Sequence, residues 1–150
     1  MTVEVAPYPF PRTSCACPQC VEPCTRQPGP LAPGDFERIA AHLGLAPEAA
    51  RAHFWASPGA VVRDGVDGHI YRVGTITPRL EGGRCVFLDA DDHCRIHAVA
   101  PAGCALFDMH MPAARAATRS MWLVRLQRDN CAYQALRATL PAAASWRPIR

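Results

Sequence analysis

Eight cysteines in a chain of 150 residues constrain this protein more than any other feature of its sequence. They form an N-terminal group, a second group about sixty residues later, and one isolated residue. The N-terminal group is Cys15, Cys17, Cys20 and Cys24; the second is Cys85, Cys94 and Cys104; Cys131 stands alone. Thiolates two or three residues apart can turn toward one metal centre. The spacing therefore predicts that both groups contribute metal ligands.

The N-terminal sequence makes a disulfide framework the weaker interpretation of these cysteines. The stretch MTVEVAPYPFPRT lacks the basic residues and the apolar run of a secretory signal. No segment has the roughly 18 consecutive apolar residues of a membrane span. We therefore expect a cytoplasmic protein with no membrane partner, in which thiols stay reduced and cysteine clusters bind metals or catalyse reactions.

Composition excludes several other classes of protein. With 49% hydrophobic and 19% charged residues, the chain is neither disordered nor a polytopic membrane protein. Its net charge of +3 is too small to indicate a nucleic-acid partner. A length of 150 residues suits one domain with a single core.

Local patterns divide the chain into five parts. Residues 1–33 hold many of the prolines and predict an irregular, metal-organised lead-in. Apolar residues at helical spacing predict that 34–57 is helical, with Asp35 as a cap. The β-branched and aromatic residues of 61–78 predict a hairpin.

Residues 85–104 form the second cysteine block, and a broad apolar stripe predicts one long helix over 113–140. Cys131 lies on that helix and is expected to be buried in the hydrophobic core. The predicted fold is mainly α with a small β-hairpin and an irregular Pro/Cys-rich N-terminal segment, a single metal-stapled α+β domain.

The number of thiols leaves the identity of the metal open. The run Cys17, Cys20, Cys24 with a remote fourth cysteine is typical of an iron–sulfur cubane. Seven thiols also exceed the four that one structural zinc needs, so two zinc centres are an alternative. His93 and His97 flank Cys94, where an imidazole could complete a Cys₃His zinc site.

Both cysteine groups, taken in order, resemble the YkgJ-like cysteine-cluster family. The run Cys17-Pro18-Gln19-Cys20-Val21-Glu22-Pro23-Cys24 matches its CxxCxxCC motif with Pro23 in place of the third cysteine. The block C-VFLDADDH-C-RIHAVAPAG-C is similar to its second block, with His97 in place of Tyr and Ala100 in place of Arg. The Tyr position implies that His97 mainly packs or forms hydrogen bonds and does not bind the metal directly.

The resemblance implies a bacterial zinc- or iron-chelating domain. A larger relative, flagellin lysine N-methylase, is associated with an iron–sulfur cluster and with methyl transfer. For this reason, and because three close cysteines with a remote one suit a cubane, we favour a 4Fe-4S cluster over zinc.

The sequence thus predicts a metal-binding protein whose ligands come from both cysteine groups, at Cys15, Cys17, Cys20, Cys24, Cys85, Cys94 and Cys104. One alternative is an enzyme subunit that uses an open iron–sulfur centre for redox chemistry or methyl transfer. Another is a structural zinc module that supports a protein partner. The metal ion or cluster is the partner common to all three.

Overall fold

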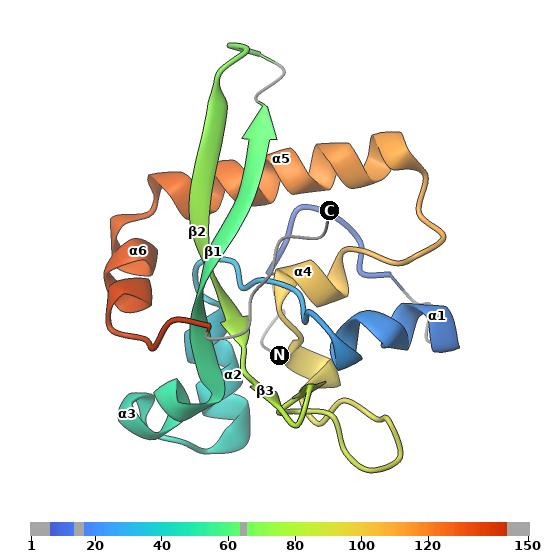
Figure 1. Cartoon of the computed structure of the whole chain (residues 1–150), viewed down its shortest axis with the longest axis vertical. Coiled ribbons are helices and arrows are strands. Elements are labelled where there is room, and N and C mark those ends of the chain that lie inside the picture. Colours follow the sequence, from blue (N-terminus) through green and yellow to red (C-terminus); the bar gives the residue numbers. More distant parts are fainter. Residues whose placement is uncertain (1–6, 14–16, 64–65, 144–150) are drawn as a thin grey trace, which may run out of the picture.

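A long antiparallel hairpin dominates the computed structural model, which describes residues 7–13, 17–63 and 66–143. Its strands are β1 (Phe54–Arg63) and β2 (Ile70–Pro78), and it projects beyond the helices (Figure 1). The pairing shifts register after Ser57, where Gly59 has a φ of +75°. A Cβ on Gly59 would lie 1.6 Å from the carbonyl oxygen of Val73, so this bulge requires glycine.

The hairpin begins earlier than predicted, and the helical segment is correspondingly shorter. Helices α2 (Asp35–Leu43) and α3 (Pro47–Ala50) lie within the predicted 34–57 segment, and a 3₁₀ turn, η2 (Arg51–His53), follows them. The prediction of helix up to residue 57 is wrong because Phe54 starts β1. Aromatic residues favour strands, and here the Phe54 ring is fully buried against the rings of Phe36 and Phe87.

The predicted long helix over 113–140 is two helices. Helix α5 (Ala113–Asp129) and helix α6 (Cys131–Ala138) are separated by Asn130, whose backbone is extended. The Asn130 side-chain oxygen accepts a 2.9 Å hydrogen bond from the backbone N–H of Tyr133, so Asn130 caps α6. This cap turns α6 onto the base of the hairpin, where both α5 and α6 contact β2 (Figure 1).

The N-terminal lead-in is less irregular than predicted. Its cysteine-containing part forms helix α1 (Pro18–Val21), with Pro18 in the first turn, followed by a 3₁₀ turn, η1 (Glu22–Thr25). Proline is tolerated at this position because the first N–H groups of a helix have no partner within the helix. The turns bring Cys17, Cys20 and Cys24 to fixed positions along the chain.

The second cysteine block is built from very short elements. It contains the end of a two-stranded ribbon, β3 (Leu80–Glu81) and β4 (Arg84–Cys85), then a 3₁₀ turn, η3 (His97–Val99), and helix α4 (Ala102–Ala105). The acidic run at its centre is a solvated turn, in which Asp89 accepts hydrogen bonds from the backbone N–H groups of Asp91 and His93.

Two hydrophobic clusters hold these elements together. The larger one joins α2, the base of the hairpin, α6 and the second cysteine block, with Phe54, Phe87 and Ile39 fully buried. The smaller one lies between α4 and α5, where Leu106 packs with Leu123. The fold is therefore a small α+β domain, mainly helical with one antiparallel hairpin, as predicted. Within the described ranges, no helix has the length and apolar content needed to cross a membrane.

Candidate metal centre

Two cysteines of the N-terminal group meet a histidine that lies about ninety residues further along the chain. The Sγ atoms of Cys17 and Cys20 are 3.5 Å apart, and Cys17 Sγ is 3.1 Å from Nε2 of His110. All three donor atoms lie within 4.8 Å of one another. We call these three residues the Cys₂His group.

Local backbone structure explains why these side chains converge. Cys17 immediately precedes α1 and Cys20 lies in it, so residues three apart face the same side of one helical turn. His110 lies in the turn before α5, where the Asp108 side chain accepts a 2.8 Å hydrogen bond from the His110 backbone N–H. Figure 1 shows α1 and this turn on the same side of the molecule.

The spacing of the Cys₂His group fits a single metal ion. Two thiolates bound tetrahedrally at about 2.3 Å from one zinc ion are about 3.8 Å apart, close to the 3.5 Å between Cys17 and Cys20. The hydrogen bond with Cys17, followed by the thiolate charge, raises the pKa of His110. The cysteines are partly buried and the histidine is exposed, so the group opens to solvent.

The other four described cysteines of the two groups form a second constellation, Cys24, Cys85, Cys94 and Cys104. Every pair among them interacts electrostatically, and the negative charge of one thiolate disfavours ionisation of the next. Cys85 is buried and the other three are partly buried. We call these residues the four-thiol group.

Burial is the main influence on the pKa values of the four-thiol group when no metal is bound. It is the largest cause of the raised pKa of each thiol, and it raises the pKa of Cys85 to about 12. Four neutral thiols in an apolar environment become ligands only when a cation replaces their protons. The residues present thus form a sulfur-only donor set, which suits zinc or an iron–sulfur cluster.

The backbone around Cys104 is fixed by the segment that follows Cys24. The Gly29 N–H points to Cys104 Sγ at 3.3 Å, and the Gly103 N–H donates a 2.9 Å hydrogen bond to the Pro30 carbonyl. A Cβ on Gly103 would lie 2.2 Å from Cδ of Pro30. The two chain segments can therefore approach this closely only with glycine at the crossing.

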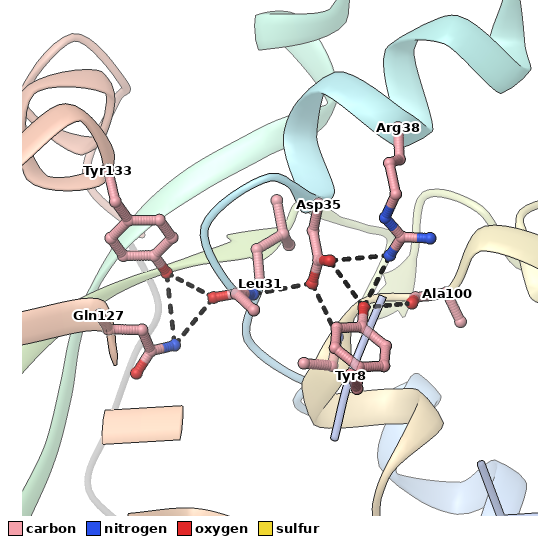
Figure 2. Close-up of polar contacts among 9 residues, drawn as sticks. Tyr8, Leu31, Asp35, Arg38, Ala100, Gln127 and Tyr133 are labelled. Carbon is pink, nitrogen blue, oxygen red and sulfur yellow. Dashed lines mark hydrogen bonds and ion pairs between the residues drawn. The ribbon is translucent and has the colours of Figure 1, made fainter. Parts of the chain in front are cut away.

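Asp35 supports the same region from α2. Its carboxylate is buried and accepts hydrogen bonds from the Tyr8 hydroxyl, from Arg38 and from the backbone N–H groups of Ala32 and Ala102 (Figure 2). Ala102 begins α4, the helix that carries Cys104. The prediction that Asp35 caps α2 is wrong, because Gly34 is the N-cap and Asp35 is the first residue of the helix; its carboxylate instead anchors α4.

The structure regroups the predicted ligands. Cys24 lies with the second cysteine block, whereas Cys17 and Cys20 lie with His110. Cys15, also a predicted ligand, lies outside the described residues. Cys131 is exposed at the start of α6, so its predicted place in the core is wrong; capping by Asn130 turns this end of the helix outward.

The histidine contribution also differs from the prediction. The sequence analysis does not select His110, which lies outside both cysteine blocks, in the turn after α4. His97, which the sequence places beside Cys94, is exposed, and its carbonyl accepts a hydrogen bond from Arg12. The only sequence signal for His110 is its place in a short turn soon after Cys104, and that signal is weak without the tertiary contact to α1.

Comparisons with known proteins agree with this donor chemistry. Residues 16–132 match the family model described as "CxxCxxCC: Putative zinc- or iron-chelating domain". No curated protein and no solved structure matches the chain. The matched region includes all six cysteines of the two described groups and His110. The chain belongs to the CxxCxxCC family of zinc- or iron-chelating domains.

Proposed function

We propose that the chain binds metal at two separate centres, a single zinc ion at the Cys₂His group and an iron–sulfur cluster at the four-thiol group. The observation that carries this proposal is the convergence of Cys17, Cys20 and His110 within 4.8 Å, apart from the thiols with which they were grouped by sequence. One extended centre shared by all the cysteines is thereby disfavoured.

A mononuclear ion suits the Cys₂His group on both distance and chemistry. In a cubane each thiolate binds a different iron, which holds the sulfurs farther apart than ligands of one ion. The 3.5 Å between Cys17 and Cys20 is the spacing of two ligands on one ion. Mixed thiolate and imidazole ligation is common for zinc, and three protein ligands leave a fourth position open at this exposed site.

A cluster suits the four-thiol group because its sulfurs are more widely spaced. Within the described part of the chain, the Cys₂His group is the one set of three or more such donors with all atoms within 4.8 Å. No three thiols of the four-thiol group are therefore that close, although every pair interacts electrostatically. Four thiolates supply one ligand to each iron of a 4Fe-4S cluster.

This ligand count favours a structural or electron-carrying cluster over a catalytic one. Methyl transfer at an open iron, the alternative predicted from the family resemblance, needs an iron without a protein ligand. With four thiols available, no such position is required. The centre would join η1, β4 and α4, which are far apart in sequence, so that metal binding contributes directly to folding.

The test is metal and acid-labile sulfide content, with a visible spectrum, of protein purified without oxygen or chelators. We expect about four irons, about four sulfides and one zinc per chain. Cys20→Ser and His110→Ala should lose the zinc and retain the brown cluster. Cys24→Ser and Cys104→Ser should bleach the protein and retain the zinc.

Cys131→Ser is the matched control, because Cys131 is exposed and lies in neither group. It should retain both metals. A colourless wild-type protein with two zinc ions and no sulfide would overturn the cluster assignment. Loss of both metals in Cys20→Ser would overturn the division into two centres.

A further inference from the structure

A cavity of about 620 Å³ lies between the hairpin and α5, and neither metal centre uses it. Its walls come from β1 and β2, from α5, and from the chain crossing at Gly29 and Gly103. A volume of this size falls within the roughly 300–1,000 Å³ of small-molecule sites in proteins.

The cavity combines an apolar lining with hydroxyl groups. Leu123, Val124 and Phe107 contribute apolar surface. Thr75 and Thr77 lie on the same face of β2, two residues apart, and both are buried with 8% exposure. A threonine hydroxyl can both donate and accept a hydrogen bond, so a polar atom of a bound ligand could contact these two groups.

The charge at the cavity is positive. Among the described residues that line it, Arg72 alone is ionisable, and Arg72 is exposed. The described residues provide no carboxylate in ion-pair contact with Arg72, although other arginines of the chain, such as Arg38 and Arg84, have such partners. The electrostatic complement of this cavity is therefore an anion.

The closed end of the cavity is preformed. Gly29 and Gly103 cross with no space for a side chain on either residue, and the Gly103 N–H is bonded to the Pro30 carbonyl at 2.9 Å. On the hairpin, Arg137 of α6 donates hydrogen bonds to the carbonyl oxygens of Ser57 and Thr75. These contacts fix the backbone of two walls of the cavity.

We propose that this cavity binds a small organic anion with an apolar body. The anionic group pairs with Arg72 at the open side, the body packs on Leu123 and Val124, and a polar atom of the ligand contacts the hydroxyls of Thr75 and Thr77. The proposal goes beyond metal binding and does not depend on the identity of either metal.

The test uses two fluorescent dyes with the metal-loaded full chain. Anilinonaphthalene sulfonate has an apolar ring system and one negative charge, and N-phenylnaphthylamine has the same ring system without the charge. We expect the wild-type protein to bind one sulfonate dye per chain, about tenfold more tightly than the neutral dye, as a charge-assisted contact provides.

Two substitutions locate the site. Arg72→Gln should weaken the sulfonate dye about tenfold and leave the neutral dye unchanged. Val124→Trp should fill the cavity and abolish binding of both dyes. Arg63→Gln, on the same hairpin but outside the cavity lining, and Met121→Gln, on another surface of α5, are the matched controls and should bind like the wild type.

Each contrary outcome refutes the proposal. Equal binding of the two dyes by wild type, or no effect of Arg72→Gln, would show that the site does not select an anion. Weakened binding in Met121→Gln would place the dye on the outer surface of α5. If Val124→Trp does not fold, the ratio of the affinities of Arg72→Gln for the sulfonate dye and the neutral dye decides whether the site selects an anion. Metal content measured on the same samples separates failure here from failure of the metal assignment.

Discussion

Asp35 accepts a 2.9 Å hydrogen bond from the backbone N–H of Ala102, 67 residues further along the chain. The same oxygen accepts a 2.7 Å bond from the Ala32 N–H, and the other oxygen accepts a 2.6 Å bond from the Tyr8 hydroxyl. Burial, followed by the charge of Asp35, raises the pKa of Tyr8, which keeps the phenol protonated as a donor. One carboxylate thus connects the N-terminal segment, α2 and α4.

Asp35→Asn should lower the free energy of unfolding by about 3 kcal/mol, because a carboxamide cannot accept from all of these donors and leaves some of them unpaired in the interior. Urea unfolding followed by circular dichroism measures the change. Tyr8→Phe, which removes one donor and leaves the carboxylate in place, should cost only about 1 kcal/mol. Equal losses in the two variants would contradict a central role for Asp35.

Gly103→Ala should disrupt the four-thiol group selectively. The added Cβ would lie 2.2 Å from Pro30 Cδ and 2.8 Å from the Gly29 carbonyl carbon, so the crossing must open and Cys104 must move. We expect loss of the metal bound by the four thiols and retention of zinc at Cys17 and Cys20, measured by elemental analysis. The control is Ala105→Gly on the same short helix, which adds no atoms. Full retention of both metals in Gly103→Ala would show that the crossing has room to adjust.

His53 should make the protein less stable in mild acid. Burial, followed by the charges of Arg79 and Arg95, lowers the pKa of His53, and its Nδ1 has no partner among the residues described. The unfolded chain, with a histidine pKa of about 6.5, then binds the proton more readily than the folded chain. The stability contributed by neutral His53 is complete above that pKa and is lost as the pH falls below it.

Replacing His53 by phenylalanine should therefore flatten the decline in unfolding free energy between about pH 7 and pH 5. Urea unfolding at several pH values measures the slope. His42→Gln serves as the control, since His42 is exposed on α2 and should leave the slope unchanged. A His53→Phe protein with the wild-type slope would mean that another group controls the acid response.

Removal of metal should loosen the N-terminal segment before the rest of the fold. Residues 17–30 are held to the second cysteine block largely through residues next to the thiols, whereas α5 and α6 pack on β2 through the hydrophobic clusters. Treatment with a chelator should increase protease cleavage within 17–30 by at least about tenfold, with little change in α5. Limited proteolysis with mass spectrometry measures both rates. Equal cleavage with and without chelator would show that metal binding does not hold residues 17–30 in place.

The sequence predicted the kinds of element better than their ends. The α+β class, the hairpin and α2 follow from residue periodicity and β-branched composition. The start of β1 at Phe54 and the break at Asn130 do not, because both depend on tertiary packing: Phe54 is extended where its ring reaches the core, and Asn130 becomes a cap where α6 turns onto the hairpin.

The ligand chemistry was likewise easier to predict than the ligand grouping. Cysteine spacing indicates which thiols are near in sequence, and Cys24 is nearer to Cys20 than to any other described cysteine. In the fold, the 3₁₀ turn η1 places Cys24 with Cys85 and Cys94, and leaves Cys20 with His110. Spacing along the chain carries no information on which of two centres a turn will face.

The contact between Gly29 and Cys104 has a consequence for biosynthesis. The two residues are 75 positions apart, so the four-thiol group cannot assemble until that much more chain has left the ribosome. At a synthesis rate of roughly 5 to 20 residues per second, the early cysteines stay exposed for about 4 to 15 seconds. During this interval each nascent chain presents accessible thiols to oxidants and to stray metal ions, and its yield should depend on how well the cell protects them.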